Sequence, residues 1–168
     1  MVMKKSRPVR DFFVSRAMKN LDFVVFDYSD SCWVDKVSHV ALFDVVISGF
    51  SIHHQPDARK RRIYSEIYDL LKAGGMFLNL EHVLPHSLFV REVFNDVFID
   101  SLYNLHVQQG GKRARAQIAS DFYNRPDKDA NILAPVEKQC EWLRKISFKD
   151  VDCYFKILEL SIFGGGEP

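Results

Sequence analysis

One stretch decides the fold: residues 43–81, which read FDVVISGFSIHHQPDARKRRIYSEIYDLLKAGGMFLNLE. The run Phe43–Gly49 is apolar and rich in β-branched residues, which is typical of a strand buried on both faces. After Pro56, isoleucines and leucines recur at helical spacing, and Met76–Leu80 is a second apolar run. Strand, crossover helix and strand form a βαβ unit, so we expect parallel strands and a right-handed crossover.

The helix of this unit carries a signal at each end. Asp57 can accept hydrogen bonds from the first free backbone N–H groups of the helix. Gly74 can adopt the left-handed conformation that ends a helix. We therefore expect the helix to begin near Asp57 and to end just before Gly74.

The rest of the chain predicts further strands and helices around this unit. We expect a strand at Phe23–Phe26, a long amphipathic helix at Ser87–His106 packed on the sheet, a helix at Val136–Ile146 with Val136, Cys140 and Leu143 buried, two strands at Asp150–Phe155 and Leu158–Phe163, and a flexible end at Gly164–Gly166.

The segment Gln108–Asp129 is polar, basic at its start and contains two glycines, and it predicts a loop with a short helix at Arg113–Phe122. Such an insertion is often a lid or a substrate loop, and a solvated connection is the alternative. We therefore divide the chain into an N-terminal arm or short helix (1–20) and one domain (21–168), with 107–130 as a lid-like insertion.

Composition limits the classes of function. The chain has 168 residues, a formal net charge of +1 and three cysteines, so neither a strong field for nucleic acid nor a disulfide framework is expected. The cysteines form no CxxC motif, and the sequence predicts no metal site. Without a run of about 18 apolar residues no membrane span is expected, and we expect a cytoplasmic protein.

The ordered set FDVVISGFSIHH, PDARKRRIYSEIYDLLKAGG and MFLNLE resembles the middle of a class I S-adenosylmethionine (SAM) dependent methyltransferase. The last part, APVEKQCEWLRKISFKDVDCYFKILELSIFGG, resembles the C-terminal part of the same family. The resemblance implies an α/β fold: an incomplete Rossmann-like methyltransferase sheet, mostly parallel with an antiparallel C-terminal strand, and helices on both faces. It also implies SAM as the cofactor.

The resemblance assigns roles to particular residues. Asp27 and Tyr28 match the acidic and apolar pair that contacts the adenine of SAM, although Asp27 could instead serve a turn. Ser48 and Gly49 lie at the carboxyl end of a strand, where ligands bind in open α/β sheets. The segment RPDKDANILAPVEKQCEWL is loosely similar to the carboxy-SAM synthase branch, in which a basic residue binds the extra carboxylate of the cofactor, and Arg125 is its nearest match.

Two adjacent histidines follow the first strand of the central unit. His53 or His54 could act as a general base near neutral pH, and we take His54 as the candidate catalytic residue. The alternative is structural: one of them caps the helix or packs in the loop. Adjacent residues point apart, so the pair does not predict a metal site.

The family's Gly-rich SAM motif does not occur in this sequence, whose first glycine is Gly49. The strand that carries this motif lies next to the Phe43–Gly49 strand in the family, so we expect an open edge or a second chain that completes the sheet. The expected function is methyl transfer to a small-molecule or RNA nucleophile, impaired in this chain alone. The alternative is a non-catalytic binding or scaffolding subunit that pairs through the open edge.

Overall fold

A computed structural model describes residues 2–3, 24–126 and 130–168. In chain order the elements are β1 (Val2–Met3), α1 (Trp33–Val37), the 3₁₀ turn η1 (Ser38–Val40), β2 (Phe43–Gly49), the 3₁₀ turn η2 (Ile52–His54), α2 (Asp57–Asp69), β3 (Leu71–His82), α3 (Leu88–Gln108), α4 (Arg115–Tyr123), α5 (Val136–Ile146), β4 (Lys149–Ile157) and β5 (Leu160–Gly166).

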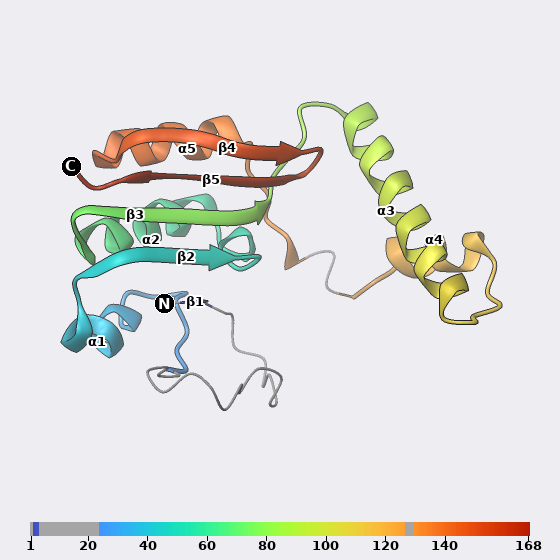
Figure 1. The fold of residues 1–168 in the computed structure, drawn as a ribbon, viewed down its shortest axis with the longest axis horizontal. Coiled ribbons are helices and arrows are strands. Elements are labelled where there is room, and N and C mark those ends of the chain that lie inside the picture. The colour runs from blue at the N-terminus through green and yellow to red at the C-terminus, as the bar shows by residue number, and fades with distance from the viewer. Residues whose placement is uncertain (1, 4–23, 127–129) are drawn as a thin grey trace.

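The strands form one sheet in the order β1-β2-β3-β5-β4. The pairs β1–β2 and β2–β3 are parallel, whereas β5 runs antiparallel to both β3 and β4. Four strands therefore share one direction and only the C-terminal strand is reversed. This arrangement confirms the expected mixed α/β sheet and the βαβ unit at its centre (Figure 1).

The edge of β2 differs from the prediction. Residues 24–26 form no strand, and residue 23 lies outside the described residues. Instead Val2 pairs with Ile47 and Met3 with Ser48, in parallel. This is the position expected for the family's first strand, so the chain's own N-terminus occupies part of the edge. The remainder of the predicted arm, 4–20, lies outside the described residues.

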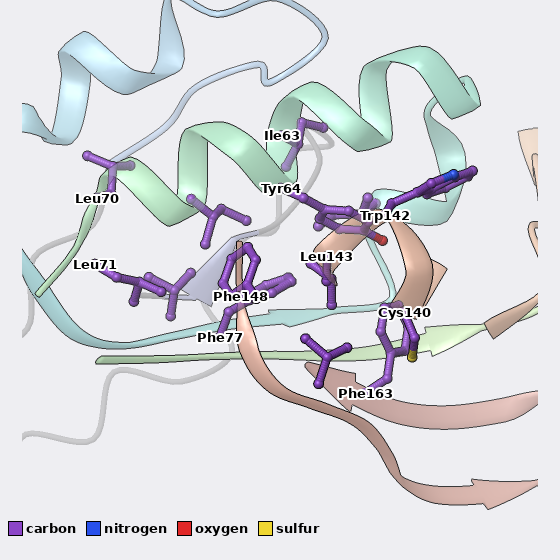
Figure 2. Packing of buried hydrophobic residues seen from close by; sticks show 14 of the residues in the cluster. Ile63, Tyr64, Leu70, Leu71, Phe77, Cys140, Trp142, Leu143, Phe148 and Phe163 are labelled. Carbon is purple, nitrogen blue, oxygen red and sulfur yellow. The ribbon is translucent and has the colours of Figure 1, made fainter. Parts of the chain in front are cut away.

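One face of the sheet carries the hydrophobic core. Helices α2 and α5 pack against each other there, and Figure 2 shows their apolar side chains directed at the strands. Ile63 and Ile67 of α2 are fully buried, and so is Leu143 of α5. Their aliphatic side chains belong to one hydrophobic cluster with Phe77 and Phe163 of the sheet. The apolar stripes predicted for both helices, including Val136 and Cys140, are confirmed.

The opposite face is apolar but less covered. Val45 and Ile47 of β2 are 43% and 46% exposed, whereas Val46 between them is fully buried. Sheets with parallel strands usually have both faces covered. Among the described helices, α2 and α5 lie on the core face. Helix α3, which we expected to pack on the sheet, packs instead against α4, and together they extend beyond the end of the sheet (Figure 1).

The distribution of apolar residues around α3 explains why its packing partner was predicted wrongly. Ser87 caps the helix by accepting a hydrogen bond from the backbone N–H of Val90 at 3.2 Å, as its sequence position indicates. Its apolar residues, however, surround the helix, and Leu88, Phe89 and Val97 remain more than half exposed. A helix that is apolar all round has no single face that predicts its packing partner.

Two glycine-rich turns also differ from expectation. Helix α2 ends at Asp69, and Gly74, with a φ of 76°, lies inside the longer strand β3 rather than at the helix end. Gly164 lies inside β5 and pairs with Leu78, so 164–166 is not a flexible end. A Cβ atom on Gly164 would lie 1.9 Å from the carbonyl oxygen of Phe77, so only glycine fits there.

Candidate functional site

Glu81, near the carboxyl end of β3, organises the loop that follows β2. Its side chain is 1% exposed. Its Oε1 accepts hydrogen bonds from the backbone N–H groups of Ser51 (3.3 Å), Ile52 (2.7 Å) and His53 (3.2 Å). Its Oε2 accepts a further hydrogen bond from Nδ1 of His53. A single buried carboxylate therefore fixes the start of η2 and orients the imidazole of His53.

Tyr28 holds the preceding segment against the same loop. It is 1% exposed, and its hydroxyl donates to the carbonyl oxygen of Ser51 at 2.7 Å and contacts the Ser51 hydroxyl. Burial raises the pKa of Tyr28 to about 12. The ring that we expected to stack on a base therefore lies in the core, with no face open to a ligand. The sequence prediction did not anticipate the hydrogen bond from Tyr28 to Ser51, because the two residues are 23 positions apart.

Asp27 lies beside Tyr28 but is exposed. Its Oδ1 accepts a hydrogen bond from the backbone N–H of Ser29 at 2.8 Å, which is the turn role considered as its alternative. Because Tyr28 is anchored to Ser51, Asp27 is held near the carboxyl end of β2. Its assignment to the adenine of SAM stays a prediction.

Ser48 and Gly49 are the last residues of β2. Ser48 is fully buried, and its Oγ has no hydrogen-bond partner among the described residues. A Cβ atom added to Gly49 would meet nothing within 4 Å, so the backbone there borders open space. Gly49 and Asp27 therefore fit a role at the edge of a SAM site, whereas Ser48 and Tyr28 face the interior. The fit to SAM is partial.

Three histidines gather at this end of the sheet. The ring centroid of His53 lies 4.0 Å from that of His54 and 5.8 Å from that of His82, the last residue of β3. His54, the predicted base, donates from Nδ1 to the carbonyl oxygen of Ala130 at 2.9 Å, which ties η2 to the loop before α5. Burial, followed by the nearby His53, lowers the pKa of His82 below its usual 6.5.

A pocket of about 530 Å³ opens beside His82, between the end of the sheet and the α3–α4 hairpin. The size is within the range of small-molecule sites. Phe94 and Phe98 of α3 and Phe122 of α4 line it, together with Arg125. The guanidinium of Arg125 lies 4.6 Å from the ring centroid of Phe122. The sequence prediction included Arg125 but missed His82, whose signal was its position at the end of the second strand, directly after Glu81.

The charged lining of the pocket includes a buried acid. Glu159, in the turn between β4 and β5, is 5% exposed, and its Oε1 has no hydrogen-bond partner among the described residues. Burial raises the pKa of Glu159, while Arg91 and Arg125 act in the opposite direction. Both arginines also line the pocket. The site therefore combines aromatic rings, two cations and one buried carboxyl.

The described residues contain no group of three or more histidine, cysteine, aspartate or glutamate residues that could hold a metal ion. They also contain no helix that is long and apolar enough to cross a membrane.

Comparison with known proteins supports the fold. No protein-family model matches the chain. A curated relative, the carboxy-S-adenosyl-L-methionine synthase of Nautilia profundicola, is 22% identical over 160 residues, which cover 93% of this chain and 58% of the relative. The chain thus spans just over half of that relative's length.

Two solved structures of methyltransferases also align with this chain. An O-methyltransferase family protein from Burkholderia thailandensis aligns with a TM-score of 0.55 at 14% identity, over 87% of this chain and 35% of that one. Human N-acetylserotonin methyltransferase in complex with SAM aligns with a TM-score of 0.50 at 15% identity, over 87% of this chain and 33% of that one. The chain has the fold of the class I SAM-dependent methyltransferases.

Proposed function

We propose that this chain carries the acceptor side of a SAM-dependent methyltransferase site and takes part in methyl transfer to a small molecule. The pocket beside His82 carries the proposal, because it lies at the carboxyl end of β3, where ligands bind in open α/β sheets. Its volume of about 530 Å³ suits a small molecule better than an RNA strand. Its location is also consistent with the methyltransferase fold.

In this proposal His82 is the general base, in place of His54. His82 lines the pocket, and its lowered pKa keeps the imidazole neutral near pH 7, the form that can accept a proton. His53 lies behind it, at 5.8 Å between ring centroids, and is held in place by Glu81. His82 would take the proton of the acceptor's nucleophilic group as that group becomes methylated.

SAM, when bound, supplies an electrophilic methyl group. Gly49 and Asp27 are the residues that would lie against it, because both are accessible near the carboxyl end of β2. The pocket residues hold the acceptor, and the aromatic side chains of α3 and α4 exclude water from it. Catalysis would rest mainly on positioning, as expected for a transfer between two bound reactants. The lid role predicted for 107–130 is part of this proposal, since α4 contributes Phe122 to the pocket.

The test is methyl transfer by His82→Gln across a panel of phenol and amine acceptors, with SAM at several millimolar and S-adenosylhomocysteine release as the readout. We expect the rate to fall about 100-fold, the lower range for loss of a general base. His86→Gln is the matched control, because His86 is exposed and pairs with Glu137.

The pH profile gives a second readout. A base with a lowered pKa is fully neutral above that pKa, so the wild-type rate should rise with pH below 6.5 and level off above it. Burial is the main cause of the lowered pKa of His82; His53, Arg125 and His54 lower it further, and Glu81 acts in the opposite direction. Unchanged transfer in His82→Gln, or a rate that keeps rising well above pH 7, contradicts the role of His82.

A non-catalytic binding subunit is the second candidate function. The exposed side chains of Val45 and Ile47, on the apolar face of β2, favour it. Light scattering at rising protein concentration tests it: this candidate predicts self-association that Val45→Lys with Ile47→Lys abolishes. A monomer at all concentrations counts against pairing between copies of the chain.

A further inference from the structure

The face of the sheet opposite the core is apolar across four strands, and we call it the open face. Residues paired in register on neighbouring strands share a face of the sheet. Ile47 of β2 pairs with Leu78 of β3. In the next row Leu80 of β3, Ile162 of β5 and Phe155 of β4 lie side by side. Ile47 and Phe155, on the two sides of the open face, are 46% and 52% exposed.

None of the described helices covers the open face. Helices α2 and α5 lie on the core face. Helix α1 packs there too, because Trp33 and Val37 belong to the core cluster and the Trp33 indole donates to Glu66 of α2 at 2.6 Å. Sheets with parallel strands usually have both faces covered, and a large exposed apolar surface marks an interaction site. The open face therefore requires an apolar partner.

Helix α3 has an outward side that is also uncovered. Residues three or four positions apart share a side of a helix, and those of the outward side are uncharged: Val90, Val93, Val97, Ser101, Asn104 and Leu105. Val97 and Leu105 are 53% and 51% exposed. The charged Asp96 and Asp100 lie on another side, where they bind Arg115 of α4. A solvated helix side normally carries charged or polar residues, so this mostly apolar side indicates a partner.

We propose that the open face binds the outward side of α3 from a second copy of this chain, whose own open face binds α3 of the first. Helix α3 does not cover its own sheet, because it extends beyond the strand ends (Figure 1). Two equivalent contacts related by a two-fold axis form a closed dimer, the commonest symmetric assembly. The pairing is independent of methyl transfer by His82, and it names the partner surface that the second candidate function leaves open.

The dimensions of the two surfaces agree. Helix α3 has 21 residues, so it is about 32 Å long. Strand β3 has 12 residues, so it is about 40 Å long, and a helix laid along the open face contacts apolar side chains over its whole length. A specific interface usually buries about 800 Å² of each partner. The reciprocal arrangement contains the helix–sheet contact twice, so each copy buries both its open face and its α3.

Two double variants test the pairing by sedimentation equilibrium. The face variant, Ile47→Lys with Phe155→Lys, places a charge on each side of the open face, so a helix bound there meets at least one of them. The helix variant, Val97→Lys with Leu105→Lys, places both charges on the outward side of α3. We expect the wild type to form a dimer and each variant to weaken it about tenfold or more, as the loss of important interface residues does.

A matched control separates the two surfaces from general effects of added charge. Val24→Lys with Val25→Lys replaces residues that are 45% and 87% exposed and that lie outside both surfaces, so it should leave the dimer unchanged. Circular dichroism checks that each variant is folded. Serine in place of lysine gives the same test should a lysine variant fail to fold.

Mixing the two variants distinguishes this arrangement from other dimers. The face variant keeps its α3 and the helix variant keeps its open face, so a one-to-one mixture retains one of the two contacts. We expect the mixture to form a heterodimer at concentrations at which each variant alone is monomeric. Two open faces packed on each other, or two α3 helices, would give no such recovery.

The outcomes separate this inference from the second candidate function. A wild type that self-associates, with variants that show no recovery on mixing, overturns the inference and leaves that candidate standing. A wild type that stays monomeric at all concentrations overturns both.

Discussion

Replacing Glu81 with leucine should lower the free energy of unfolding by about 4 kcal/mol. The change removes the acceptor of three backbone N–H groups, those of Ser51, Ile52 and His53, and of the His53 imidazole. Each buried donor left without a partner costs about 1–3 kcal/mol, and water can reach some of them after rearrangement. The loss is a large part of the roughly 5–15 kcal/mol that stabilises a typical domain.

Chemical denaturation of matched variants measures this effect. Glu81→Gln keeps one acceptor oxygen and should lose about half as much stability as Glu81→Leu. Glu137→Leu, at an exposed position, should change stability by less than about 0.5 kcal/mol. A loss below about 1 kcal/mol in Glu81→Leu would show that the loop after β2 does not depend on this carboxylate.

The central unit could be predicted from sequence because its signals are local. The bounds of β2 and α5 match the predicted ranges Phe43–Gly49 and Val136–Ile146, and the strand pairing follows from the βαβ rule. Helix α2 begins at Asp57 as predicted, but Pro56 precedes it at the cap position and no side chain makes a capping hydrogen bond. The turn after the helix was misjudged, because β3 continues back through Gly74 to Leu71.

The remaining differences depend on contacts between distant residues. The two residues of β1 are too few to carry a periodic pattern, and their pairing with β2 is a tertiary contact that no local sequence signal indicates. The three final glycines indicate flexibility in isolation, whereas the close approach of Gly164 to Phe77 requires one of them inside a strand.

In the candidate site, too, local features were predictable and contacts between distant residues were not. The strand ends that border the site were predicted, but the roles of individual side chains were not. Tyr28 was placed at a ligand because of its position after Asp27, whereas its hydrogen bonds to Ser51 hold it in the core. His54 was taken as the base because it lies in the βαβ loop, and His82 was missed because the pocket beside it forms only when α3 and α4 fold over the strand end.

SAM should bind this chain about a thousandfold more weakly than it binds a complete methyltransferase site. The resemblance implies three sets of contacts: a Gly-rich turn, an acidic residue on the ribose, and an acidic and apolar pair on the adenine. Only Asp27 of the third set is exposed here, and the first glycine of the sequence is Gly49. Hydrogen bonds to charged groups contribute about 1.5–3 kcal/mol each, so losing two sets removes about 4 kcal/mol. A micromolar site then becomes roughly millimolar.

The most direct test of the account is a titration of the isotope-labelled chain with SAM, followed by the backbone amide signals. The account predicts a dissociation constant on the order of 1 mM and signal changes concentrated at Asp27, Gly49 and His82, with Asp27→Ala weakening the binding further. Signal changes that avoid the carboxyl ends of β2 and β3 would contradict a SAM site at this edge. Micromolar binding abolished by Asp27→Ala would contradict the expected weakness and show that this chain holds a working cofactor site.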